Sequence, residues 1–243
     1  GVVPTIRRLT RTEYQNAIRD LLKVNLDVTE LLPKDESSHG FDNITVGTLS
    51  PTLLNRYVGV AQKVARIAVG QPLESPDFRV IRVPADQSQS ARLEGLPYGT
   101  RGGVLFDHPF PVTAEYDFEI RLTRDRDEQV EGLTGGKHEV EILIDGEAVS
   151  RFEIKRPKGR DHSKVDAHLK VRLKVPAGAR QVAVTFVKKP DSILETKRQP
   201  YDAQYNVHRH PRQAPAVFQV TINGPYGEQT STETASRQAI FQS

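Results

Sequence analysis

The sequence contains no cysteine, no methionine and no tryptophan among its 243 residues. Without cysteine, the chain can form no disulfide, no zinc–thiolate site and no covalently attached c-type haem, which requires a C-x-x-C-H motif. No apolar run approaches the roughly 18 residues of a membrane-spanning helix, and no signal peptide is visible. Because the initiator methionine is also missing, we expect the chain to be a segment of a longer protein.

The sequence also has only a small excess of positive over negative charge. Lysine and arginine number 34 against 31 aspartate and glutamate residues, so the formal net charge is only +3. So small an excess does not indicate a nucleic-acid partner, and no aromatic stacking pattern accompanies the basic residues. The length suits one large β domain or two modest domains, each with a genuine core.

Residues 5–70 have the pattern of a helical module. Thr10 and Glu13 form a capping box at the start of a first helix, whereas Ser50, Pro51 and Gly70 mark the two ends of a second. The apolar stripe of the first helix comprises Tyr14, Ile18, Leu21 and Leu22. The predicted buried face of the second comprises Leu54, Tyr57, Val58, Ala61, Val64, Ala65 and Ala68. Two such helices cannot bury a core alone, so we expect them to pack on the β block or on another domain.

The rest of the chain has the pattern of strands and turns. Its clearest segment alternates strictly, with Tyr116, Phe118, Ile120 and Leu122 on one face and charged residues on the other, which predicts a half-buried antiparallel strand. Asp145-Gly146 predicts a two-residue hairpin turn, and residues 176–179 are given a similar role between the next two strands. The predicted strands span residues 78–83, 103–107, 114–123, 137–145, 148–155, 168–175, 180–188 and 216–222.

These elements predict a mostly β protein with an N-terminal α-helical segment. The architecture is an antiparallel, jelly-roll-like β-sandwich packed with a two-helix module. The predicted domains are a helical module over residues 1–72, a β-sandwich over 73–227, and a polar tail or the start of a next module over 228–243.

Residues 189–215 form an unusually long predicted loop, and loops of this length are usually either functional or disordered. His208 and His210 are spaced so that both imidazoles could chelate a metal, although no third ligand has a diagnostic spacing. A polar loop is the simpler interpretation of the pair.

Charged side chains on and near the central strand allow two further interpretations. Carboxylates could hold calcium, which takes several hard oxygen ligands, but a solvated strand face explains them as well. A basic row could meet phosphate or an anionic glycan, or could simply solubilise the protein. The carboxylates are Glu115, Asp117, Glu119, Asp125, Asp127 and Glu128. The basic residues are Lys170, Arg172, Lys174, Lys155, Arg156, Lys158 and Arg160.

Motifs of common enzyme classes are missing. The sequence has no nucleophile elbow, no H-E-x-x-H motif and no cysteine. The glycine-rich Gly99-Thr-Arg-Gly-Gly103 lacks the G-K-[ST] ending of a phosphate loop, so we interpret it as a conformational turn. We expect no catalytic activity in this segment.

Three stretches resemble a known family. They are RRLTRTEYQNAIRDLL (residues 7–22), LLPKDESSHGFDN (31–43) and LSPTLLNRYVGVAQKVAR (49–66). They resemble the N-terminal helical domain of unknown function in planctomycete-type multidomain c-type cytochrome proteins. Later stretches, among them LPYGTRGG, HEVEILIDGE and VTINGPYG, resemble the carbohydrate-binding-module-like β-sandwich that follows in those proteins. The resemblance implies a periplasmic or extracellular location, with haem only in other parts of the parent protein.

We therefore expect a non-catalytic, extracytoplasmic binding module whose leading ligand is polysaccharide. Aromatic platforms and planar polar side chains suit sugars, because a pyranose has an apolar face and many hydroxyls. The alternative is a structural or docking subunit of a periplasmic redox or other multiprotein complex. The candidate ligand-binding residues are Tyr201, Asp202, Tyr205, Arg209, Tyr98 and Arg101. Calcium is a possible cofactor, and we expect neither a nucleic-acid partner nor a membrane span.

Overall fold

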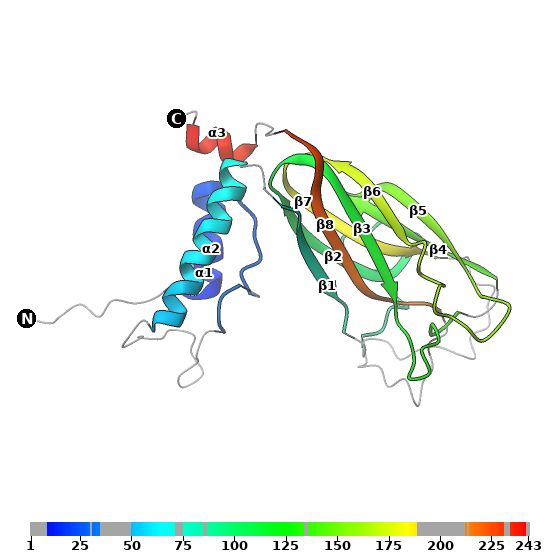
Figure 1. Ribbon diagram of the computed structural model, residues 1–243. Coiled ribbons are helices and arrows are strands. Elements are labelled where there is room, and N and C mark those ends of the chain that lie inside the picture. Colours follow the sequence, from blue (N-terminus) through cyan, green and yellow to red (C-terminus); the bar gives the residue numbers. More distant parts are fainter. Residues whose placement is uncertain are drawn as a thin grey trace, which may run out of the picture.

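The computed structural model describes residues 9–29, 31–34, 50–70, 75–84, 87–133, 136–188, 212, 214–230 and 234–241. These residues form an antiparallel β-sandwich with a small helical module beside it (Figure 1). The predicted fold class is confirmed.

The sandwich consists of two four-stranded sheets, and every predicted strand is present. One sheet has the order β1-β8-β3-β6 and the other the order β2-β7-β4-β5. The strands are β1 (Asp77–Arg82), β2 (Thr100–Phe110), β3 (Thr113–Leu122), β4 (Lys137–Ile144), β5 (Glu147–Lys155), β6 (Lys170–Val175), β7 (Gly178–Val187) and β8 (Val217–Thr230). Strands β3 and β8 are long neighbours whose antiparallel pairing runs from Thr113↔Thr230 to Leu122↔Val217.

The sandwich core lies between the two sheets, as the alternation predicts. The apolar face of β3 is at most 2% exposed, and Phe118 and Ile120 are completely buried. Phe110 from β2 packs edge-on against Tyr116, with ring centroids 4.7 Å apart, while Phe186 closes the core from β7. Burial of these large side chains is the main stabilising contribution to the sandwich.

One predicted turn is confirmed and another is wrong. Asp145 and Gly146 have φ of 52° and 85° and join the paired strands β4 and β5. Residues 176–179 do not form a hairpin, because β6 pairs with β3 whereas β7 pairs with β2 and β4. The turn crosses from one sheet to the other. The residues of the turn are compatible both with a hairpin and with a crossing between sheets. Long-range packing decides which sheet each strand joins.

The helical module begins with the two predicted helices, α1 (Arg11–Leu22) and α2 (Pro51–Val69). The capping box is present, because Thr10 Oγ1 accepts from the Glu13 N–H at 3.2 Å and Glu13 Oε2 accepts from the Thr10 N–H at 2.9 Å. Ser50 caps α2, and Gly70 ends it with φ of 66°. None of the helices in the described part of the chain is long and apolar enough to cross a membrane.

The predicted buried face of α2 is partly wrong. Val64 and Ala68 are buried, but Leu54 and Val58 are 52% and 47% exposed, and Ala61 and Ala65 are exposed as well. On α1, Leu21 is likewise 75% exposed although the stripe included it. The helices are covered along one narrow stripe only, so the adjacent apolar positions remain at the surface.

The apolar side chains of α1 and α2 pack mainly on residues outside the sandwich. These are residues 24–28, Leu31, Leu32 and the short C-terminal helix α3 (Ala235–Phe241), with Ile240 packed on the cluster. Arg237 donates to the Val69 carbonyl, which attaches α3 to the end of α2. Residues 228–230, assigned from sequence to a tail or a next module, continue β8. The helical module meets the sandwich at its β1–β2 side, where Asn25 Nδ2 donates to Asp107 Oδ2 at 2.7 Å.

Candidate functional site

A polar cleft of about 760 Å³ lies at the end of the sandwich where β3 finishes. We call it the Arg124 cleft. The end of β3, the turn over residues 123–130, the turn over residues 160–168 and Phe218 of β8 form its walls. Its lining includes Glu119, Arg121, Arg124, Asp127, Glu128, Arg160, Ser163, Asp166, Lys170 and Phe218.

Arg124 holds the two turns of the cleft together. Its Nη2 pairs with Asp166 Oδ1 at 2.8 Å, and its Nη1 donates to the carbonyls of Glu128 and His162 at 2.8 and 2.9 Å. Asp166 Oδ2 in turn accepts from the Leu122 N–H at 3.1 Å. The side chains of Arg124 and Asp166 are 19% and 12% exposed, so the pair is largely screened from water. A charge-assisted network this well satisfied fixes the floor of the cleft in one geometry.

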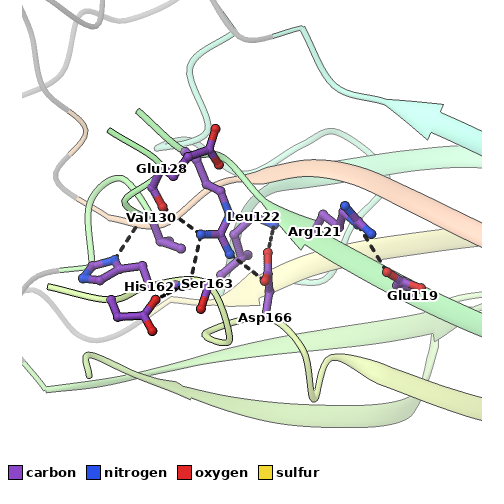
Figure 2. Close-up of polar contacts among 10 residues, drawn as sticks. Glu119, Arg121, Leu122, Glu128, Val130, His162, Ser163 and Asp166 are labelled. Carbon is purple, nitrogen blue, oxygen red and sulfur yellow. Dashed lines mark hydrogen bonds and ion pairs between the residues drawn. The ribbon is translucent and has the colours of Figure 1, made fainter. Parts of the chain in front are cut away.

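His162 attaches the second turn to the first. Its side chain lies close to Val130 (Figure 2), and its Nδ1 accepts from the Val130 N–H at 3.0 Å. Because Nδ1 is an acceptor, a neutral ring carries its proton on Nε2. The residue is only 6% exposed, so it belongs to the scaffold of the cleft more than to its surface.

Aspartates shape both turns by accepting from backbone N–H groups two or four residues further along the chain. Asp125 Oδ1 accepts from the N–H groups of Asp127 and Gln129, each at 2.9 Å. Asp161 Oδ1 accepts from the Ser163 N–H at 2.9 Å. Hydrogen bonds from the Ser163 hydroxyl and N–H lower the pKa of Asp161. These local turns are a known preference of aspartate, and they leave Asp127, Ser163 and the surrounding basic residues to face the cleft.

Two of the six predicted calcium-binding carboxylates, Asp117 and Glu119, pair with basic side chains. Asp117 forms a bidentate pair with Arg172 at 2.6 and 2.8 Å, and Arg172 also lies 4.3 Å from the centre of the Tyr226 ring. Glu119 pairs with Arg121 at 3.2 Å (Figure 2) and with Lys170 at 3.4 Å. Within the described ranges, no three carboxylate or histidine side chains gather closely enough to hold a metal ion.

The basic row is thereby explained in part as a ladder of cross-strand ion pairs. Lys170, Arg172 and Lys174 of β6 lie opposite Glu119, Asp117 and Glu115 of β3. Opposite charges across neighbouring strands stabilise pairing modestly.

The structure separates the two predicted site residues of the 98–101 turn. Tyr98 is 92% exposed, with the Arg92 guanidinium 4.7 Å from the centre of its ring. Arg101 points inward, donating to the carbonyls of Gln89 and Pro215 at 3.3 and 3.0 Å and lying 4.4 Å from the centre of the Phe186 ring. The Tyr98 ring is therefore accessible at the surface, whereas Arg101 links the segments around Gln89 and Pro215.

The other predicted site residues lie outside the described residues. They are Tyr201, Asp202, Tyr205, Arg209, His208 and His210. The described residues on either side of this stretch are held by a backbone hydrogen bond and by a buried ion pair. The Lys188 N–H donates to the Gly99 carbonyl at 2.7 Å, beside Tyr98. Arg212 forms a buried ion pair with Glu131 at 2.9 Å.

The sequence analysis did not identify Arg124, Asp166 and His162 as residues of one site. Arg124 and Asp166 are 42 positions apart, and His162 lies 32 positions from its partner Val130. The only local signal was the density of aspartates at positions 125, 127 and 161, which indicates turns without saying that two turns meet.

Comparison with known protein families finds a match for the helical part only. Residues 7–70, which include α1 and α2, match the family described as "Protein of unknown function (DUF1587)". None of the curated proteins matches the chain.

Two solved structures are distantly similar to the sandwich. A native family 35 carbohydrate binding module from Clostridium thermocellum is 10% identical, with a TM-score of 0.27, over 60% of this chain and 90% of that one. The EclA C-terminal domain, a sugar-binding protein, is 12% identical, with a TM-score of 0.26, over 62% of this chain and 81% of that one. With scores this low, the ligands of those proteins carry no argument about this chain.

Proposed function

We propose that the β-sandwich is a non-catalytic carbohydrate-binding module and that the Arg124 cleft is its sugar site. The observation that carries the proposal is the composition of the cleft, which combines a rigid charged floor, walls with both donors and acceptors, and one partly exposed aromatic ring. The parent protein, on the family resemblance, is exported and cytochrome-associated, and any haem belongs to its other domains.

The walls of the cleft match the chemistry of a sugar. Hydroxyl groups both donate and accept, and the cleft offers Arg121, Arg160 and Lys170 as donors beside Asp127 and Glu119 as acceptors. Phe218 is 36% exposed and lies on the same cleft, so its ring is available to the apolar face of a pyranose. A volume of about 760 Å³ is within the usual range of small-ligand sites.

Tyr98 supports a second contact surface for a long glycan. Its ring is almost fully exposed and is held by Arg92, and the chain leaves for residues 189–211 directly beside it. Tyr201, Asp202, Tyr205 and Arg209 remain our candidates on that stretch, with His208, His210 and calcium as candidate metal chemistry.

A glycan array tests the proposal. The chain is applied with calcium and then with a chelator, beside the variants Phe218→Ala, Tyr98→Ala, Tyr201→Ala and Tyr205→Ala. Glu147→Ala, which removes an exposed charge outside the cleft, is the control. Saturable binding that Phe218→Ala weakens and Glu147→Ala does not supports the Arg124 cleft. Binding that only the tyrosine variants weaken moves the site to whichever of Tyr98, Tyr201 and Tyr205 is required. Loss on chelation adds a metal site. A blank array in both conditions contradicts carbohydrate binding for the glycans tested.

The exposed apolar residues of the helical module favour docking as a second candidate function. Leu21, Leu54 and Val58 are between 47% and 75% exposed, which is unusual for large aliphatic side chains on a helix pair. Analytical ultracentrifugation of the chain mixed with the remainder of its parent protein tests this function. A complex that Leu54→Lys abolishes supports docking, and failure of the two to associate contradicts it.

A further inference from the structure

A second cavity, of about 200 Å³, lies between α2 and the β1–β2 side of the sandwich. Its apolar walls come from both parts of the molecule: Ile67 belongs to α2, and Phe78, Pro109 and Tyr116 belong to the sandwich. Phe78 is 69% exposed in spite of its place in this wall, so the cavity has a mouth. The lining is completed by Leu26, Gly59, Gln62, Lys63, Arg66, Asp77, Arg79, His108, Pro111, Ile222 and Gly224.

His108 belongs to the wall of this cavity, and its Nδ1 is buried and makes no hydrogen bond to any described residue. A buried ring without a partner for this atom is costly to charge. Burial, helped by Arg79 and Lys63, lowers the pKa of His108 to about 3, so the ring is neutral at pH 7 and offers one donor and one acceptor nitrogen.

The rim of the cavity is mainly cationic. Lys63 and Arg66 come from α2, and Arg79 comes from β1, against a single carboxylate, that of Asp77. Asp77 already accepts from the Phe78 N–H at 2.8 Å, and Arg79 donates to the Asp107 carbonyl at 3.2 Å. Three cations around a low-dielectric opening favour an anionic group on whatever enters.

We propose that this cavity binds small aromatic carboxylates, with the ring among the apolar side chains and the carboxylate at the cationic rim. Its volume suits the ring, because an apolar cavity of about 150 Å³ can hold benzene. Binding here is independent of sugar binding in the Arg124 cleft, which lies at the other end of the sandwich.

Benzoate is the probe, and ¹H–¹⁵N NMR titration of the whole chain is the measurement. Benzamide keeps the ring without the charge, and acetate keeps the charge without the ring. We expect saturable shifts of the Gly59, Phe78 and His108 amides with a Kd of about 1 mM or tighter for benzoate. Benzamide and acetate should bind at least about tenfold more weakly.

Three variants decide the location of binding. A Cβ at Gly59 meets no atom within 4 Å, so Gly59→Phe should fill the cavity without disturbing the fold, and Gly59→Ala should leave it open. We expect Gly59→Phe to abolish binding, whereas Gly59→Ala and Glu147→Ala, an exposed position outside the lining, bind like the parent. The absence of saturable shifts, or shifts that persist unchanged in a folded Gly59→Phe variant, would overturn the proposal.

Discussion

A few buried polar residues tie the loops of the sandwich to its sheets. Gln89 is the clearest, because its amide makes three backbone hydrogen bonds while only 3% exposed. Nε2 donates to the Val217 carbonyl at 2.7 Å, and Oε1 accepts from the N–H groups of Val217 and Gly103 at 2.9 and 3.0 Å. One side chain thereby connects the backbones of β2 and β8, which belong to different sheets and do not pair with each other.

Replacing Gln89 with leucine should destabilise the protein strongly. Three backbone groups would lose their partner in a buried place, and each unsatisfied group costs about 1–3 kcal/mol. With partial relaxation, we expect the free energy of unfolding to fall by roughly 3–5 kcal/mol. Urea denaturation measures the change. Gln181→Leu, at an exposed position, is the control and should stay within about 0.5 kcal/mol of the parent; a similar effect at both positions would refute the role of Gln89.

His108 should make stability depend on pH. Its pKa is about 3 in the folded chain and about 6.5 when unfolded, so between these values the unfolded chain binds more protons. The stability contributed by the neutral ring is therefore fully present above pH 6.5 and is lost as the pH falls. Relative to His108→Leu, the parent should lose about 1.4 kcal/mol per pH unit below pH 6.5. Denaturation of both proteins between about pH 7 and about pH 4.5 tests this, and parallel curves would refute it.

At the scale of elements, glycine has opposite roles in α2 and β2. Gly59 lies inside a helix with open space where a side chain would start, whereas Gly103 has φ of 88° and a Cβ there would collide with the Val184 carbonyl oxygen. The Gly103 site is a β-bulge, at which the register between β2 and β7 shifts.

Alanine substitution should separate these two roles. Gly59→Ala should raise the free energy of unfolding by up to about 1 kcal/mol, because alanine favours the helix. Gly103→Ala should lower it by at least about 2 kcal/mol, because strain adds to the clash. Thermal unfolding of the two variants measures both signs, and a destabilised Gly59→Ala would contradict the open space assigned to that position.

Local patterns predicted the elements well and their partners less well. The β3 alternation, the helix caps and the Asp145-Gly146 hairpin follow from neighbouring residues, so sequence was sufficient for them. Residues 176–179 were misassigned because a turn does not say which sheet the next strand joins. The Arg124 cleft could not be predicted, since two turns far apart in sequence meet there, and of the predicted site residues Tyr98 and Arg101 alone fall in the described part of the chain.

At the scale of the molecule, the chain leaves the helical module once and returns to it. It passes from α2 into β1, and after β8 it comes back as α3 (Figure 1). Ile240 and Arg237 then pack and hydrogen-bond on the module. The two parts of the molecule are therefore joined by sequence at both ends of the sandwich segment.

Deleting residues 234–243 should weaken the helical module and spare the sandwich. The apolar cluster around Ile18 and Val64 would lose the cover that Ile240 gives it. We expect hydrogen exchange in α1 and α2 to speed up at least about tenfold, with exchange in β3 and β8 unchanged. Ser243 deletion alone is the control, and equal protection of α1 and α2 with and without α3 would contradict this arrangement.

Calorimetry tests most directly whether the sandwich binds carbohydrate in the Arg124 cleft, as we propose. The best glycan from the array is titrated into the parent chain, into Phe218→Ala and into Gly59→Phe, which alters only the other cavity. We expect Phe218→Ala to raise Kd about tenfold or more, because an aromatic contact of this kind contributes about 1.5 kcal/mol, and Gly59→Phe to leave it unchanged. An unchanged Kd in Phe218→Ala would contradict the account.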